Sequence, residues 1–495
     1  MERLSLDTLP AHPTGNFALP AVDPRSLSIG LVHLGIGAFH RAHQAVFTEV
    51  SAAATGDDRW GEFAVTGRSA AVVDQLAPQD CLYGVLTRSA DRASLRVVGG
   101  VRSVVNGGAD PAVTCAALMT AAVQVVTLTI TEKGYLRAAD GGLATGTEAV
   151  TADAAAARAV LAGHPPGRAG SAVGLLTAGL AGRFRAGAEP ISVLSCDNLP
   201  GNGAALARLV HELAELAGAD GFADWLQRSV TFPSTMVDRI VPATTDRDRA
   251  EAARFLQLRD DAVVVAEPFG QWVIEDRFAA ARPAWEMSGA TLATDVAPYE
   301  KAKLRMLNGT HSLLAYLGAL RGHRTIAAAV ADESLAAAAR GLQVEDALPT
   351  LQAPPGLDLR GYGAQILDRF ANPHLRHTTT QVAMDGSQKL PVRVLGTARD
   401  RLRAGAVPHH CALAVAAWMV YVHRGLETAE LPLNDPLAPV LREHAAGPSD
   451  RLADRMLRIE QVFDAELAED ERFRDAVRSA TADLLARNTA ASPRR

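Results

Sequence analysis

Lys303, Asn308 and His311 are spaced K-x4-N-x2-H within a stretch that has the periodicity of an α-helix. At about 100° per residue, Asn308 lies roughly 140° and His311 roughly 80° around the helix from Lys303, so one surface can present all three. The trio suits the interconversion of an alcohol and a ketone. A partly buried lysine serves as base, an asparagine amide stabilises a developing alkoxide, and a histidine orients a neighbouring hydroxyl. The alternative from spacing alone is a solvated lysine and a core histidine.

A second candidate site follows the apolar run 28–34, where Gly35-Ile36-Gly37-Ala38-Phe39 leads into a predicted helix. Glycines at the first and third positions allow a tight turn and the close approach of a pyrophosphate to a helix N-terminus. His40 stands where the dinucleotide fingerprint has its third glycine, so an ordinary glycine turn is the alternative. No carboxylate that could bind the ribose hydroxyls of NAD follows the second predicted strand, but Arg68 does. An arginine there can bind the 2′-phosphate of NADP, so NADP is possible beside NAD. The alternative is that Arg68 is an ordinary surface residue.

The elements that must position these residues change character along the chain. Up to residue 290, short β-branched runs alternate with helical stretches, an order typical of a parallel α/β sheet with crossover helices. The predicted strands are 28–34, 63–66, 82–85, 123–131 and 191–194, and the predicted helices between them include 42–50 and 204–216.

Beyond residue 290 the strand-like runs disappear, and helical periods rich in alanine and leucine dominate. The helices predicted there are 299–320, 326–342, 361–370, 411–422 and 451–463. We therefore expect an α/β domain over residues 1–290 and an all-α domain over residues 291–495.

Composition and charge exclude several functional classes. The 495 residues carry 49 basic and 55 acidic side chains, a formal net charge of −6, and no basic cluster interleaved with aromatic residues, so nucleic acid is not an expected partner. The longest apolar run, 411–422, is too short to span a membrane. The four cysteines are far apart and form no CxxC, which predicts buried thiols and a cytoplasmic protein. His40 and His43 form H-x2-H, but no further ligand motif completes a metal site.

Seven sequence segments, in order, resemble one known family. They are GIGAFHRAHQA (35–45), TEKGY (131–135), SCDN (195–198), FPSTMVDRIVP (232–242), EPFGQWVIED (267–276), KLRMLNGTHSLLAYLG (303–318) and DGSQKLPVR (385–393). Together they resemble the mannitol dehydrogenase family of long-chain polyol dehydrogenases, over residues 28–480.

The resemblance implies a Rossmann-type N-terminal domain, a helical C-terminal domain and an active site in the cleft between them. It also implies a monomeric enzyme that needs no metal ion, uses NAD as its cofactor and acts on a small sugar acid or polyol. By this resemblance, Lys303 is the general acid/base, Asn198 and Asn308 hold the reacting oxygen, and His311 orients the substrate. Lys389 contacts the substrate, and Asp238 is an acidic group beside cofactor and substrate. Gly35, Gly37 and Phe39 form the turn that binds the cofactor.

The family includes mannitol 2-dehydrogenase, fructuronate reductase, tagaturonate reductase and arabinitol dehydrogenase. Gln381, where mannitol 2-dehydrogenases usually carry an arginine, and TEKGY in place of TEGGY resemble fructuronate reductases. A uronate adds a carboxylate that needs a cation, and Lys133, Arg376 and Arg393 are candidates. Thr378, however, stands where the closest fructuronate reductases have an arginine. We predict D-fructuronate and D-mannonate as the substrate pair, ahead of D-mannitol and D-fructose or another polyol. A catalytically inactive nucleotide-binding protein is the remote alternative.

Overall fold

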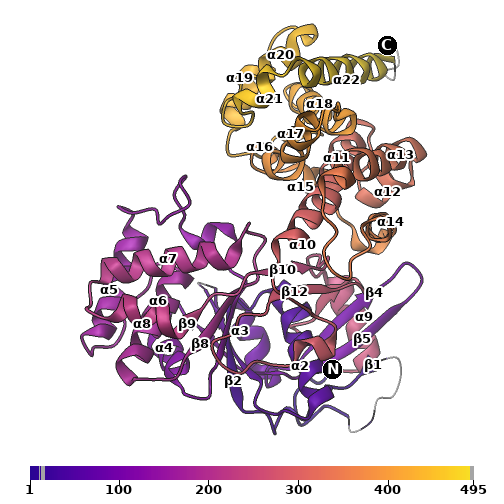
Figure 1. Cartoon of the computed structure of the whole chain (residues 1–495). Helices are drawn as coiled ribbons and strands as arrows, with labels where there is room; N and C mark the ends of the chain where they lie inside the picture. Colours follow the sequence, from indigo (N-terminus) through magenta and orange to yellow (C-terminus); the bar gives the residue numbers. More distant parts are fainter. Residues whose placement is uncertain (11, 13–16, 68, 491–495) are drawn as a thin grey trace. The chain divides into compact units, whose positions relative to one another are not determined.

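The computed structural model describes residues 1–10, 12, 17–67 and 69–490. The chain divides into two compact units, Met1–Val296 and Ala297–Arg495 (Figure 1).

The first unit is built on a six-stranded sheet in which every neighbouring pair is parallel. Its strand order is β6-β3-β2-β7-β8-β9. These strands are β6 (Val101–Asn106), β3 (Gly61–Thr66), β2 (Ile29–Leu34), β7 (Val125–Leu128), β8 (Ile191–Ser195) and β9 (Val230–Thr231). Their apolar, β-branched sequences suit a sheet that is covered on both faces. The prediction of a parallel α/β sheet is confirmed.

Side chains alternate between the two faces of this sheet, and each face has its own helical cover. Val32, Leu34 and Val126 point into a core formed with α4 (Pro111–Met119), α5 (Glu148–Leu161), α6 (Ala172–Ala186) and α7 (Asn202–Ala217). The alternate residues face α1 (Ala38–Ala42) and α2 (Gln44–Thr55), and Leu31 packs with Phe47 there. The same face carries two buried polar residues, His33 and Glu62.

Two smaller sheets were not predicted. One has the order β1-β5-β4-β11 and the other β10-β12-β13. Their strands are β1 (Phe17–Ala18), β5 (Ala93–Val98), β4 (Tyr83–Arg88), β11 (Val264–Ala266), β10 (Thr235–Asp238), β12 (Gln271–Glu275) and β13 (Thr291–Ala293). The predicted strand 82–85 overlaps β4, but β4 lies in the first of these smaller sheets and not in the six-stranded parallel sheet. It pairs parallel with β11 and antiparallel with β5, because a tight turn, closed by the hydrogen bond from Ser89 N to Arg92 O at 3.0 Å, joins β4 to β5 directly.

The described part of the second unit is helical, and its strand-like contact is an isolated bridge between Thr325 and Thr378. Its helices are α10 (Ala297–Ala302), α11 (Gly309–Leu320), α12 (Ile326–Ala331), α13 (Glu333–Gly341), α14 (Leu359–Phe370), α15 (Thr379–Ala383), α16 (Gly386–Leu390), α17 (Gly396–Arg403), α18 (His409–Arg424), α19 (Ala438–Ala445), α20 (Leu452–Met456), α21 (Ala465–Glu469) and α22 (Glu471–Ala490). Most of α18 is buried, so it forms the centre of this unit.

Two helix predictions in this unit need correction. The stretch 326–342 is divided at Asp332, whose carboxylate accepts hydrogen bonds from Ser334 N and Leu335 N and so begins a new helix, α13. The stretch 451–463 is α-helical only in α20, because Leu457 to Phe463 form turns. In both places the apolar periodicity continues through a break in the helix, so it does not show where the helix ends.

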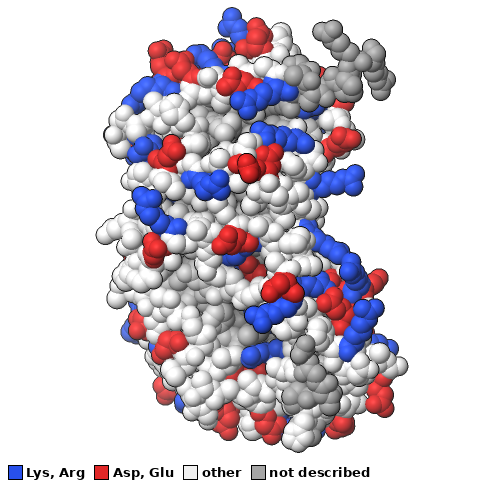
Figure 2. Space-filling model, turned by 90° about the vertical axis from the view of Figure 1, so that its right-hand side faces the viewer, with Lys and Arg blue, Asp and Glu red and all other residues white. Residues whose placement is uncertain are grey.

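No helix in the described ranges is long and apolar enough to cross a membrane. All four cysteines are buried and unpaired, as predicted. On the face shown in Figure 2, basic and acidic side chains lie interspersed over the described surface, which is not the basic groove that nucleic acid favours.

Candidate functional site

Lys303 and Asn308 begin and end a π-helical turn, η4 (Lys303–Asn308), that joins α10 to α11 in one continuous helix. Gly309 N donates to Leu304 O, five residues earlier, which is the hydrogen bond that defines this geometry. Residues five apart therefore lie nearly one above the other, and Asn308 is much closer to the direction of Lys303 than the roughly 140° of a regular α-helix. Lys303 is buried, with 6% of its surface exposed, and Asn308 is half-buried.

Close backbone packing accompanies this π turn. A Cβ atom at Gly309 would lie 3.0 Å from the carbonyl oxygen of Arg393, so the glycine allows a second helical segment to approach. That segment is another π turn, η8 (Pro391–Leu395), and it packs against η4. The sequence gives a signal for this in the Asn308-Gly309 pair, because glycine weakens a regular helix and is best explained by a packing need.

His311, in the first turn of α11, is held as a neutral imidazole. Its ring stacks on Phe370 at a centroid distance of 4.6 Å and on His377 at 5.7 Å. Burial lowers the pKa of His311 well below its ordinary value, and the charges of His377, Arg393 and Lys389 lower it further. Its buried Nε2 has no hydrogen-bond partner among the described residues. A neutral ring with an unused polar atom can bind a hydroxyl group of a ligand.

Cationic side chains gather around His311. Lys389 on α16 places Nζ 3.4 Å from Val382 O, and Arg393 on η8 donates from Nη1 to Ser312 Oγ at 3.3 Å. Arg369, which the sequence analysis missed, is buried at the end of α14 and also lowers the pKa of His311.

Arg376, the other predicted cation of this unit, is exposed, and the ring contact with His311 is made by its neighbour His377 instead. The structure therefore brings Lys389 and Arg393 of the predicted set beside His311. An aromatic stack between His311 and Phe370 could not be read from the sequence, because these residues are far apart along the chain.

In the first unit, the glycine turn follows β2 at the carboxyl edge of the parallel sheet. Gly35 has φ = 102°, and a Cβ there would lie 2.2 Å from Thr129 O, so only glycine fits. The amides of Gly35 and Ile36 donate to Val65 O at 2.8 and 3.1 Å, which ties the turn to β3. The first hydrogen bond of α1 runs from Arg41 N to Gly37 O, so the amides of Ala38 and Phe39 precede it and point out of the helix start.

Asn198 is exposed at the same edge, directly after β8. Its neighbour Asp197 fixes the loop, because the Asp197 carboxylate accepts from Ile130 N at 2.9 Å, Thr131 N at 3.0 Å and Tyr135 Oη at 2.7 Å. These bonds join the segments that leave β7 and β8. Burial raises the pKa of Asp197, and the same three donors oppose the shift.

A second link runs from this loop to Asp238, at the carboxyl end of β10. The Asn202 amide nitrogen donates to Asp197 O at 3.1 Å and to Thr235 O at 2.9 Å, so one side chain joins the Asn198 loop to the strand that ends at Asp238. Asp238 is 6% exposed. Asp197 and Asn202 are positioning residues that the sequence analysis missed, although Asp197 lies within the SCDN segment.

Lys133 is exposed on the 3-10 turn η2 (Glu132–Tyr135), which follows β7 at the same sheet edge. Arg68, the predicted NADP determinant, lies outside the described residues. Among those described, no group of three or more His, Cys, Asp or Glu side chains is placed to hold a metal ion.

Comparison with known proteins agrees with this arrangement. Residues 29–287 match the mannitol dehydrogenase Rossmann domain, and residues 295–485 match the mannitol dehydrogenase C-terminal domain. The chain belongs to the mannitol dehydrogenase family.

Within this family the chain is similar to proteins that act on different substrates. It is 41% identical to the uncharacterized oxidoreductase YdfI of Escherichia coli strain K12, over 96% of both chains. It is 38% identical to the D-mannonate oxidoreductase of the same organism, over 95% of this chain and 96% of that one. A solved structure, Pseudomonas fluorescens mannitol 2-dehydrogenase in ternary complex with NAD and D-mannitol, is 31% identical with a TM-score of 0.85, covering 99% of this chain and 98% of that one.

The turn in this mannitol dehydrogenase family member fits the dinucleotide that a Rossmann domain implies. A Cβ at Gly37 would meet only Gly35 O, at 3.8 Å, so the backbone is open on the side from which a pyrophosphate approaches. The amides of Ala38 and Phe39 are directed there at the start of α1, where anions are stabilised by backbone N–H groups.

The two glycines of the turn give a matched test. Gly35→Ala is expected to lower the free energy of unfolding by about 2–4 kcal/mol, because the new methyl group meets Thr129 O and the positive φ disfavours alanine. Gly37→Ala has an extended φ of −92° and open space, so its stability should stay within about 0.5 kcal/mol of the parent. Urea denaturation measures both values. Equal destabilisation of the two variants would contradict this account of the turn.

Proposed function

We propose that this protein is an NAD-dependent oxidoreductase that interconverts a secondary alcohol and a ketone of a sugar acid or polyol. The observation that carries the proposal is the π turn, which places the buried Lys303 beneath Asn308 on the same helix that carries His311, about one turn after Asn308. Each of the three side chains has the chemistry that one part of the reaction needs. NADP remains the alternative cofactor.

The turn Gly35–Phe39 would hold NAD, which would supply the acceptor for the hydride of the carbinol carbon. Lys303 removes the hydroxyl proton as the carbonyl forms and returns it in the reducing direction, since burial disfavours the ammonium form of a lysine and leaves the amine free to accept a proton. Asn308 and Asn198 donate amide hydrogens to the reacting oxygen and stabilise its developing negative charge. His311 binds a neighbouring hydroxyl through its neutral ring. No step of this scheme uses a metal ion, and the residues of one chain suffice for it.

The proposed substrate pair is D-fructuronate and D-mannonate. A uronate differs from a ketose by a carboxylate, and Arg393 and Lys389 surround His311 with positive charge that such a group would neutralise. The likeness to D-mannonate oxidoreductase supports the same choice. D-Mannitol and D-fructose are the second candidate, because the solved mannitol 2-dehydrogenase shares nearly the whole fold. Lys133 and Asp238 are proposed to contact the substrate from the first unit.

The role of Lys303 is tested by Lys303→Met, which keeps an apolar side chain of similar length. The value of kcat should fall by roughly 10²- to 10⁴-fold, because the proton acceptor is lost. NADH consumption, followed by its near-ultraviolet absorbance with fructuronate, tagaturonate and fructose in parallel, measures this effect. Lys301→Met is the matched control, because Lys301 is exposed two residues earlier and pairs with Asp400 at 3.5 Å. Near-normal turnover in Lys303→Met would overturn the mechanism.

The substrate proposal is tested by Arg393→Met. Loss of a charged partner should raise KM for fructuronate by roughly 10-fold or more, while KM for fructose changes little, because fructose has no carboxylate. Arg376→Met removes an exposed arginine of the same unit, which is the competing candidate for the carboxylate. It should leave both KM values nearly unchanged if Arg393 binds the carboxylate. Reduction of fructose without reduction of fructuronate by the parent protein would contradict the proposed substrate. Binding of NADH without turnover of any ketose or ketouronate would favour an inactive nucleotide-binding protein.

A further inference from the structure

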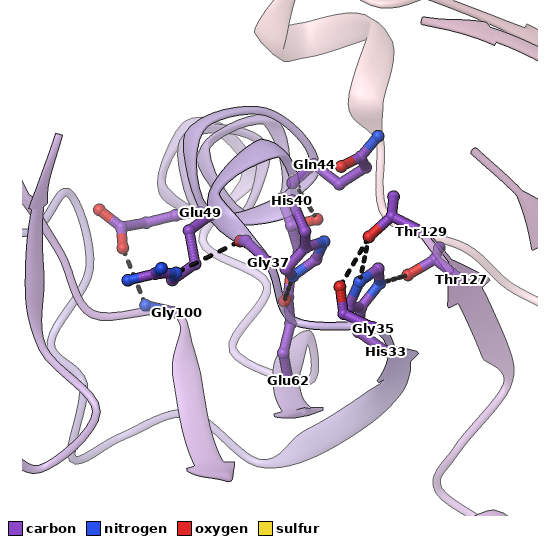
Figure 3. Close-up of polar contacts among 12 residues, drawn as sticks. His33, Gly35, Gly37, His40, Gln44, Glu49, Glu62, Gly100, Thr127 and Thr129 are labelled. Atoms are coloured by element: carbon purple, nitrogen blue, oxygen red, sulfur yellow. Dashed lines mark hydrogen bonds and ion pairs between the residues drawn. The ribbon is translucent and has the colours of Figure 1, made fainter. Parts of the chain in front are cut away.

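His40 occupies the position of the third glycine in the dinucleotide fingerprint, and its imidazole is fully buried beneath the turn. Its Nε2 lies 2.8 Å from Oε2 of Glu62, the second residue of β3, which is also fully buried (Figure 3). A glycine there would allow close helix–strand packing. This chain instead places a hydrogen-bonded acid and imidazole between α1 and the sheet. Neither residue is part of the proposed catalytic set.

One face of the His40 ring is stacked on the ring of His33, with ring centroids 3.3 Å apart and planes inclined by 11°. His33 connects this pair to the turn itself. The Thr129 hydroxyl donates to Gly35 O at 2.8 Å, so it must accept its 3.0 Å bond from Nε2–H of His33. Nδ1 of His33 then accepts from the Thr127 hydroxyl at 2.7 Å. His33 is therefore a neutral ring of fixed tautomer that helps to hold the carbonyl of Gly35.

The acid and imidazole pair changes its proton content near neutral pH. Burial raises the pKa of Glu62 to about 7, against the opposing effects of His33 and Thr48. Burial lowers the pKa of His40 to about 3. Below about pH 7, Glu62 is thus a neutral acid that donates to His40 Nε2. Above it, neutral His40 donates from Nε2 to a buried carboxylate, and the pair carries a net negative charge.

Other charged and titratable groups lie around this pair. Arg41 on α1 keeps its guanidinium group on Ala262 O and near the Tyr83 ring, and Tyr83 on β4 donates to Arg41 O at 2.9 Å. Burial raises the pKa of Tyr83 well above its ordinary value, so the phenol stays neutral. Burial also raises the pKa of Glu49 on α2, and the amides of Gly99 and Gly100, which donate to its carboxylate at 2.6 and 2.9 Å, oppose that shift.

We propose that the Glu62–His40 pair positions the dinucleotide turn and that its shared proton sets the affinity of the turn for the dinucleotide. Binding is tighter when Glu62 is protonated. A pyrophosphate carries negative charge to the start of α1, and an ionised Glu62 beneath the same helix opposes it in a medium of low dielectric constant. By linkage, binding of the dinucleotide draws a proton onto Glu62, and affinity falls as the pH rises through its pKa. The inference rests on the proposed cofactor.

The test measures NADH binding without substrate, by energy transfer from tryptophan to the nicotinamide, from about pH 6 to about pH 8, on either side of the Glu62 pKa of about 7. The parent protein should lose roughly 5-fold in affinity over this range. Glu62→Gln keeps a hydrogen-bonding side chain but cannot ionise, so its affinity should stay near the low-pH value throughout. Glu189→Gln, which removes an exposed carboxylate before β8, should follow the parent.

A second measurement needs no variant. Calorimetry of NADH binding near pH 7, repeated in buffers of different ionisation enthalpy, should show net proton uptake by the parent protein. A parent affinity that does not change with pH, an unchanged pH dependence in Glu62→Gln, or binding without proton uptake would each overturn the inference while leaving the cofactor assignment intact. Absence of NADH binding at every pH would instead overturn the cofactor assignment, and this inference with it.

Discussion

The first unit depends on the way its parallel strands end. In a parallel sheet all carboxyl ends lie along one edge, and the segments that leave there lose the ladder bonds that satisfied their polar groups. Here side chains replace those bonds across neighbouring strands. Thr129 holds Gly35 O, and Asp197 holds the amides of Ile130 and Thr131. The glycine turn and the loop of Asn198 are therefore both held by hydrogen bonds to the segment 129–131, so moving either one breaks these bonds.

In the second unit, irregular helical backbone positions the polar side chains of the proposed site. A regular α-helix cannot place residues five apart in the same direction, but a π turn can, at the cost of weaker backbone geometry. The packing of η8 against η4, with Gly309 in contact with the Arg393 carbonyl, stabilises that geometry from outside. The same contact sets the position of Arg393 relative to His311. The backbone irregularity and the arrangement of polar side chains thus have one common cause.

Local sequence patterns predicted the features that depend on local preference. The β-branched run before Gly35 and the apolar period around Lys303 indicate a strand and a helix by propensity and periodicity alone. The π turn was not predicted, because its six residues are too few for periodicity to distinguish it from a regular α-helical turn. Strand β5 was missed because polar Ser94 and Arg96 interrupt its apolar residues, and its pairing with β4 depends on tertiary structure. Glu62 gave no signal, since a carboxylate at the start of a strand is usually exposed, and its partner His40 is identified only in three dimensions.

The two units also treat anions in opposite ways. Beneath the glycine turn, three buried histidines are neutral, and the turn offers an anion only backbone amides and a helix start. Burial is also the main reason that the His311 ring is uncharged, but there, by contrast, Arg393, Lys389 and Arg369 concentrate positive charge around the ring that lowers its pKa further. Backbone amides suit a pyrophosphate, because their recognition depends on shape more than on net charge. Full charges would suit the single carboxylate of the proposed uronate, which distinguishes it from an otherwise similar sugar. On that proposal, the different electrostatics of the two sites follow from the different anions that they bind.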